Sequence, residues 1–349
     1  MMFNAEDIVR DNIKNLKPYS SARDEFKGEA SVFLDANENA FGSPLSTAYN
    51  RYPDPLQLEL KTKLSGIKGL PPQNIFLGNG SDEAIDILFR VFCEPILDNV
   101  ILCPPTYGMY EVSANINNVQ VKKVNLLPSF DLDVEGILSA IDSHTKLLFI
   151  CSPNNPSGNS FHQDDIELLI QKFAGIVVID EAYINYSRKP SFIRYLTEYA
   201  NVVVLQTFSK AWGLAALRLG MAFASEAIIG YMNKVKPPYN INQATQQLAL
   251  EALDNIAWVN QRIVETVKER NQLMQAVQTL SITQSVYPSD SNFFLAKLMD
   301  AKYVYDQLVS KGIIVRDRSR VELCENCLRI TVGTMDENQK LITELKQIA

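Results

Sequence analysis

The sequence predicts an α/β protein with a large, mostly parallel sheet flanked by helices and a second, smaller α/β unit. The chain has 349 residues, which is long for a single hydrophobic core. Short apolar runs alternate with amphipathic stretches through its middle, as strand–helix units of a parallel sheet do. The runs 147–151 and 176–179 are apolar on both faces, which is typical of strands buried inside such a sheet.

Strands and helices alternate in the expected large domain. Strands are expected over residues 100–103, 147–151, 176–179, 202–206 and 219–224. In the helix expected over 84–92, the apolar side chains fall on one stripe: Ala84, Ile85, Leu88, Val91 and Phe92. Similar patterns predict helices over 162–173 and 191–200.

The pattern changes at about residue 242, where long polar-rich helical sequence begins and continues to about 280. It is followed by a strand, a helix, two strands and a terminal helix, the first four expected over 292–298, 301–311, 312–315 and 328–332. The first thirty residues carry a proline and little periodicity. We therefore expect an N-terminal arm over 1–28, a large domain over 44–245, and a small domain formed by 29–43 and 246–349.

Composition excludes several classes of function. The net charge is −7, and acidic and basic residues are mixed along the chain, so no basic block supports binding of nucleic acid or an anionic membrane. Residues 1–10 lack the apolar core of a signal peptide, and no apolar run reaches membrane-spanning length. The expected location is the cytoplasm.

The cysteines predict reduced core thiols and no metal site. Their number, five, is odd. Cys324 and Cys327 form a lone C-x-x-C, which would be a redox pair or half of a zinc site. A zinc site needs two more ligands, and neither of the two histidines has a matching spacing. The other cysteines lie in apolar runs, which suits buried thiols: Cys93, Cys103 and Cys151.

Ligands of such sheets bind beyond the carboxyl ends of the strands, so the residues just after each strand are the candidates for a site. GNGSDE, residues 78–83, opens the 84–92 helix. Its glycines would let backbone N–H groups approach an anion, and Ser81 is a good N-cap. A phosphate cradle and an ordinary capped turn both fit this stretch.

Three further strand ends carry groups that could meet a ligand. Tyr107, in PPTYGMY, could stack on a planar ring or pack its own loop. Asn155, in SPNNPSG, could present an amide or belong to a plain turn. Asp180, in DEAY, ends an apolar strand and needs a cationic partner, unless it caps the next element; Tyr183 follows it.

The stretch TFSKAWGLAALRLG places Lys210 just after an apolar strand, where an ammonium group is costly to desolvate. If Lys210 lies in the same crevice as Asp180, its ammonium is partly desolvated, and this desolvation lowers its pKa and gives a nucleophilic amine. Thr207, Ser209 and Arg218 add two hydroxyls and a cation, which together can bind a phosphate. A solvated surface lysine is the ordinary alternative, and the compatible groups at the other strand ends weigh against it.

Together these groups fit a planar, phosphorylated ring that bonds to a lysine, which describes pyridoxal 5′-phosphate. Asp180 would keep the pyridine nitrogen protonated. Asn155 and Tyr183 would donate to the phenolic oxygen, and Lys210 would bind the aldehyde.

The ordered motifs GNGSDEAI, CPPTYGMY, SPNNPSG, VVIDEAYINY, TFSKAWGLAALRLG and CLRITVG resemble the fold-type I aminotransferases, with LKPYSSAR extending the match almost to the N-terminus. LKPY, LDANENAFG and NRYPD are similar to the histidinol-phosphate branch of that family. The resemblance implies a cytoplasmic enzyme of histidine biosynthesis. It would exchange an amino group between L-histidinol phosphate and 2-oxoglutarate, giving imidazole-acetol phosphate and glutamate.

Related activities remain open alternatives. The same fold serves aromatic-amino-acid aminotransferases and a threonine-phosphate decarboxylase. A regulator that only senses the cofactor would need an added helix-turn-helix domain, for which the short arm has no room.

The resemblance also implies cofactor-binding roles. Lys210 would move a proton between the substrate carbon and the cofactor C4′, with Asp180 and Tyr183 as the other catalytic residues. Tyr107 would stack on the ring, and the Asn155–Pro156 bond would be cis. The phosphate would be held by Gly80, Ser81, Asp82, Thr207, Ser209 and Arg218. Tyr52 would reach the cofactor phosphate of a neighbouring subunit, so a homodimer is implied.

On the substrate side, Arg329 would clamp the anion of either substrate. Arg316 would add charge for the phosphate or for the distal carboxylate of glutamate. Tyr19 and Asn37 would close over the substrate. Trp212 stands where phenylalanine is usual in the family, and the sequence assigns it no role.

Overall fold

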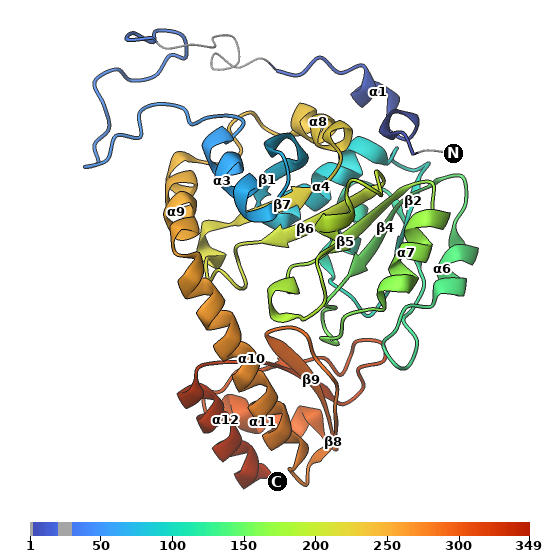
Figure 1. Cartoon of the computed structure of the whole chain (residues 1–349). Helices are drawn as coiled ribbons and strands as arrows, with labels where there is room; N and C mark the ends of the chain where they lie inside the picture. Colours follow the sequence, from blue (N-terminus) through green and yellow to red (C-terminus); the bar gives the residue numbers. More distant parts are fainter. Residues whose placement is uncertain (1–2, 20–29) are drawn as a thin grey trace.

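The computed structural model describes residues 3–19 and 30–349, and it contains one large and one small sheet (Figure 1). The large sheet has seven strands in the order β1-β7-β6-β5-β4-β2-β3. Its strands are β1 (Ile75–Asn79), β2 (Asn99–Leu102), β3 (Gln120–Lys123), β4 (Thr145–Cys151), β5 (Ile176–Asp180), β6 (Val202–Thr207) and β7 (Leu219–Phe223). The strands from β3 to β6 pair in parallel, whereas β7 is antiparallel to both of its neighbours, β6 and β1.

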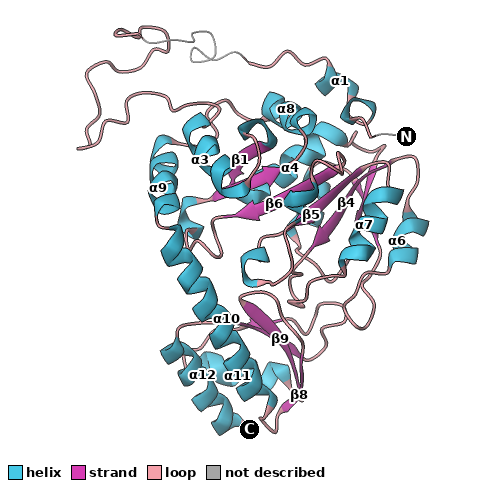
Figure 2. Ribbon diagram, viewed as in Figure 1, coloured by secondary structure: helices cyan, strands magenta, loops and turns pink. Residues whose placement is uncertain are grey.

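Both faces of the large sheet are buried, which explains the apolar runs in the sequence. Side chains alternate between two hydrophobic clusters, with Leu148 and Ile150 on one face and Leu147 and Phe149 on the other. Helices cover both faces (Figure 2). They are α3 (Leu58–Lys68), α4 (Gly80–Phe92), α5 (Met109–Ile116), α6 (Val134–Ala140), α7 (Gln163–Lys172), α8 (Glu226–Val235) and α9 (Gln243–Asp254).

The expected large-domain strands are all present, within two residues at each end. The helix expected over 84–92 begins earlier, at Gly80, so Ser81 lies in the first turn and is not the N-cap. The strand β3 was not foreseen, because its polar sequence QVKK lies at the sheet edge, where lysines are usual. The helix expected over 191–200 is wrong: only a 3-10 turn, Phe192–Tyr195, forms there.

The small sheet has four antiparallel strands in the order β10-β11-β9-β8. They are β8 (Thr283–Val286), β9 (Phe293–Leu298), β10 (Arg316–Asp317) and β11 (Cys327–Thr331). One face packs on α10 (Ile256–Gln278), α11 (Ala301–Ser310) and α12 (Met335–Ile348). Figure 1 shows α10 running from the large sheet to the small one, so a single helix links the two halves.

The strand expected over 312–315 is wrong. Gly312 adopts a positive φ of 73° after α11, and the Ile313 N–H donates back to the Leu308 carbonyl. These residues therefore complete the helix C-terminus, and pairing with β11 begins only at Arg316.

The N-terminal segment is more structured than expected. Residues 3–19 contain a 3-10 turn, Ala5–Asp7, and α1 (Asp11–Lys14), and they bury Val9 and Ile13 in the hydrophobic cluster that contains α4. Arg10 pairs with Glu94 at 2.9 Å. The rest of the expected arm, residues 1–2 and 20–28, lies outside the described residues.

The segment 30–56 extends away from the body of the molecule (Figure 1). Its internal hydrogen bonds join Glu38 and Asn39 to residues 50–52, at the end opposite the small sheet. The described part of 29–43 thus differs from the expected placement with the small domain. It exposes large apolar side chains, among them Val32, Leu34, Phe41 and Leu45.

Two expectations about composition can be compared with the structure. All five cysteines are buried free thiols, as expected. In the described part of the chain, no helix is both long and apolar enough to cross a membrane.

Candidate active site

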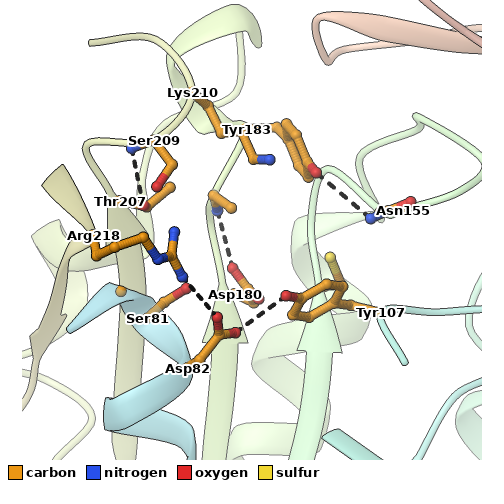
Figure 3. A pocket seen from close by; sticks show the side chains of 13 residues that line it. Ser81, Asp82, Tyr107, Asn155, Asp180, Tyr183, Thr207, Ser209, Lys210 and Arg218 are labelled. Atoms are coloured by element: carbon orange, nitrogen blue, oxygen red, sulfur yellow. Dashed lines mark hydrogen bonds and ion pairs between the residues drawn. The ribbon is translucent and has the colours of Figure 1, made fainter. Parts of the chain in front are cut away.

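A pocket opens at the carboxyl ends of β4, β5 and β6, beside the start of α4 (Figure 3). Its empty volume, including the open space at its mouth, is about 520 Å³. Nearly all of the expected cofactor-binding residues line it: Gly80, Ser81, Asp82, Tyr107, Asn155, Asp180, Tyr183, Thr207, Ser209, Lys210 and Arg218. Cys151 and Ala182, which the sequence did not single out, complete the lining.

One end of the pocket is suited to an anion. Gly80 opens α4 with a φ of 73°, a conformation that favours glycine, and a Cβ there would displace the Arg218 guanidinium, whose Nη2 would lie 2.7 Å away. The free N–H groups and dipole of the α4 N-terminus face the same place. Arg218 donates to Asp82 Oδ2 at 3.1 Å, and Tyr107 donates to Asp82 Oδ1 at 3.1 Å.

The hydroxyls of Thr207, the last residue of β6, and of Ser209, just after it, lie at the same end (Figure 3). The Ser209 N–H donates to Thr207 Oγ1 at 3.0 Å, which orders the turn between strand and lysine. Hydroxyls, a guanidinium and a helix N-terminus therefore meet at one point, as a phosphate requires.

Asp180 lies at the bottom of the pocket and is only 3% exposed. Burial raises the pKa of its carboxyl, whereas hydrogen bonds from Tyr110 and from the Ala182 N–H oppose this rise. Tyr110 donates to Asp180 Oδ2 at 2.6 Å, and the Ala182 N–H donates to Oδ1 at 3.0 Å. A cation in the pocket would stabilise the ionised form further.

Tyr110 contacts the pocket residues Asp180 and Tyr107, and the sequence did not single it out. It is fully buried on α5, stacks on Phe149 at 4.8 Å between ring centroids, and meets Tyr107 edge-on at 5.5 Å. Its place three residues after Tyr107 puts both rings on one face of the same turn. This spacing could have indicated that Tyr110 lies near the pocket, but a tyrosine packed in the hydrophobic core would show the same spacing.

Lys210 Nζ lies over the Tyr183 ring, 5.5 Å from its centroid, and points into the pocket (Figure 3). Partial desolvation and the positive charges of Arg329 and Arg218 lower the pKa of Lys210, while Asp180 raises it. The net effect increases the fraction of neutral amine, which is the nucleophilic form.

A row of hydrogen-bonded side chains crosses the mouth of the pocket, formed by Tyr183, Asn155 and Arg329. Asn155 Nδ2 donates to Tyr183 Oη at 3.5 Å, and Arg329 Nη1 donates to Asn155 Oδ1. Arg329 also lies over the Phe293 ring, at 5.1 Å. A small-sheet arginine therefore reaches a loop of the large sheet.

Other expected site residues lie outside the pocket in this chain. Tyr19 is exposed beside Pro55, and Asn37 shares an open groove with Tyr52, which stacks on Tyr239 at 4.6 Å between centroids. Arg316 is exposed and stands opposite Arg329 in the β10–β11 register.

Two details of the pocket loops correct or complete the sequence analysis. The expected cis bond at Asn155–Pro156 is wrong; in this loop the cis bond is Ser152–Pro153. Trp212 is buried, with its ring centroid 5.2 Å from that of Phe208, so its role is to pack the core beneath the Lys210 turn.

Comparison with known proteins gives one family. A family model described as aminotransferase class I and II matches residues 31–345. The chain is 54% identical over 346 residues to a histidinol-phosphate aminotransferase of Cytophaga hutchinsonii and 56% identical over 347 residues to one of Bacteroides thetaiotaomicron. Each match covers 99% of both chains.

Solved structures share the fold. The histidinol-phosphate aminotransferase of Sinorhizobium meliloti, solved with pyridoxal 5′-phosphate, superposes with a TM-score of 0.79 at 24% identity, over 90% of this chain and 89% of that one. The enzyme of Clostridium acetobutylicum gives 0.79 at 23% identity, over 86% and 91% of the two chains. These likenesses establish the architecture.

Proposed function

The chain belongs to the class I and II aminotransferase family, and we propose that it is a histidinol-phosphate aminotransferase that depends on pyridoxal 5′-phosphate. It would exchange an amino group between L-histidinol phosphate and 2-oxoglutarate, giving imidazole-acetol phosphate and glutamate. The observation that carries the proposal is the meeting of Lys210, Asp180 and Arg218 in one pocket of a chain whose full-length relatives bear that name.

The residues of the pocket fit the cofactor. The anion end, with Gly80 and Arg218, suits its phosphate, and the buried carboxylate of Asp180 suits a protonated ring nitrogen. Tyr107 offers an aromatic face beside the ring position, and Lys210 offers an amine for the aldehyde. When bound, the cofactor supplies a carbon that takes the amino group and a ring that withdraws electrons from the substrate.

Side chains of the protein would then bind the cofactor ring, orient the substrate and transfer the proton. Asp180 would keep a proton on the ring nitrogen of the bound cofactor, and Asn155 and Tyr183 would donate hydrogen bonds to the ring's oxygen. Lys210 Nζ would accept the proton from the substrate carbon that bears the amino group and pass it to the cofactor carbon that takes this group. The hydrogen-bonded side chains from Tyr183 to Arg329 would bind the substrate's anionic group, and this would position the substrate carbon for the proton transfer.

Replacing Tyr110 with phenylalanine is expected to weaken cofactor binding by about 10- to 100-fold, because the carboxylate of Asp180 loses a charged hydrogen bond and its pKa rises. The dissociation constant would be measured by titrating the cofactor and following its absorbance. Tyr186→Phe, a buried tyrosine outside the pocket lining, is the matched control. Equal affinities in both variants would contradict a positioning role for Tyr110.

Replacing Arg329 with alanine is expected to raise the KM for histidinol phosphate and for glutamate together, each by about 10- to 100-fold. Both anions would use the same guanidinium, and Asn155 would also lose its partner. Steady-state kinetics with each substrate test this, with Arg262→Ala on the exposed face of α10 as control. A rise in KM confined to one substrate would refute a shared clamp.

We also propose that the enzyme is a homodimer in which Tyr52 reaches the partner's cofactor phosphate. Tyr52 lies outside the pocket of its own chain and is half exposed, and the apolar side chains of 30–56 lack cover within the described chain. In this proposal residues 44–245 bind the cofactor, residues 246–349 supply the substrate arginines, and Tyr19 and Asn37 approach the substrate when the dimer assembles. Sedimentation of wild type and Tyr52→Phe holoenzyme tests the assembly.

The activity itself is tested by a panel of amino donors given to the purified holoenzyme with 2-oxoglutarate. Faster formation of glutamate from histidinol phosphate than from phenylalanine or tyrosine supports the proposal. A preference for phenylalanine would identify an aromatic-amino-acid aminotransferase instead. Release of carbon dioxide from threonine phosphate would identify a decarboxylase.

A further inference from the structure

The strands β10 and β11 place three arginines together on the small sheet. Arg316 stands directly opposite Arg329 in the antiparallel register. The Arg318 N–H donates to the Cys327 carbonyl at 2.9 Å, which extends the pairing by one more residue. Side chains two residues apart in a strand share a face, as do directly opposed residues. Arg316, Arg318 and Arg329 therefore lie on the same face.

This face looks toward the pocket. Leu295, opposite Arg329 on β9, is buried in a cluster of the large sheet, and Phe293 packs edge-on against Tyr183 with 5.0 Å between centroids. Arg329 donates to Asn155 in the pocket wall. The other face of β11, with Leu328 and Ile330, packs on the small-sheet helices. The three arginines thus share the face of the small sheet that is turned toward the pocket, and Arg329 contacts the pocket wall directly.

These charges have no acidic partner within the described chain: none of the ion pairs there involves Arg316, Arg318 or Arg329. The Nε atoms of Arg318 and Arg329 are buried without a hydrogen-bond partner, and so is the hydroxyl of the adjacent Ser319. Burial and the positive charges of Arg329 and Arg316 lower the pKa of Arg318. Such an arrangement costs free energy unless an anion occupies it.

The number of cations favours an anion with more than one charge. A carboxylate neutralises one guanidinium, whereas a phosphate monoester carries nearly two charges and three acceptor oxygens at neutral pH. We propose that Arg318 joins Arg316 and Arg329 in holding the substrate phosphate, and thereby sets the preference for a phosphorylated donor over glutamate. This inference rests on the proposed function, because it takes the donor to be a phosphate monoester.

The test compares Arg318→Gln with Arg320→Gln, a control at an exposed arginine in the same turn. In Arg318→Gln holoenzyme, the KM for histidinol phosphate should rise by about 10- to 100-fold through loss of a charged hydrogen bond. The KM for glutamate in this variant, and both KM values in the control, should stay within about twofold of wild type. An equal rise for glutamate, or no rise for histidinol phosphate, would overturn the inference.

Two further measurements keep the result decisive. If Arg318→Gln does not fold, Arg318→Lys replaces it in the test. A lysine lacks the planar guanidinium fork, so the KM for the phosphorylated donor alone should rise several-fold. An unchanged KM overturns the inference. Calorimetry of inorganic phosphate binding to the holoenzyme, whose cofactor fills the other phosphate site, does not depend on turnover. Weaker binding by the Arg318 variant shows that Arg318 helps to hold a phosphate, even if wild type fails to use histidinol phosphate and the proposed function is wrong; equal binding refutes the inference.

Discussion

Replacing Lys210 with alanine is expected to abolish amino-group transfer, by at least about 10⁴-fold, while the protein stays folded. Lys210 is the amine that points into the pocket from the turn after β6, over the Tyr183 ring. Partial desolvation and the charges of nearby arginines lower its pKa, which increases the fraction of the neutral amine that can act as a base and a nucleophile. Alanine keeps the backbone of the turn but leaves no group to move the substrate proton.

Turnover of histidinol phosphate would be measured beside far-ultraviolet circular dichroism and thermal unfolding. Lys172→Ala, an exposed lysine at the end of α7, is the matched control and should keep full activity. Comparable turnover in the two variants would show that Lys210 is not the catalytic amine. A lost circular dichroism signal would instead assign Lys210 a structural part.

Replacing Asp180 with asparagine is expected to weaken cofactor binding and to slow turnover, each by about 10²- to 10³-fold. The carboxylate is buried and held by Tyr110 and the Ala182 N–H, so its charge is directed at the position proposed for the ring nitrogen. An amide has nearly the same shape but no charge. It cannot keep that nitrogen protonated, so the ring withdraws electrons less well.

Glu181 provides a close control for this prediction. It is the next residue, it is equally buried, and burial raises its pKa to about 7, yet its carboxylate binds Ser191, Gln206 and the Phe192 N–H outside the pocket. Glu181→Gln should alter stability and leave the cofactor dissociation constant near that of wild type. Equal loss of affinity in both variants would argue for a general effect of charge at this strand end.

Much of the pocket could be predicted because the chemistry follows a simple spatial rule. Asn155, Asp180 and Lys210 lie far apart in the sequence, but each lies at or just after the end of a parallel strand. The carboxyl ends of neighbouring parallel strands meet at one edge of the sheet. Buried parallel strands are also the easiest to recognise, because both of their faces are apolar. Polar edge strands such as β3 carry no such signal.

The sequence by itself determined the main sheet, the residues at its strand ends and the chemistry that those residues share, because local hydrophobic patterns and parallel topology suffice to bring them together. Only the tertiary structure decided which side chains from other elements contact these residues. Tyr110 meets Asp180 because α5 packs on the sheet, and Arg318 joins Arg329 because a two-residue strand pairs in one particular register. Both contacts join segments distant in the sequence, and packing rather than local pattern selects such partners.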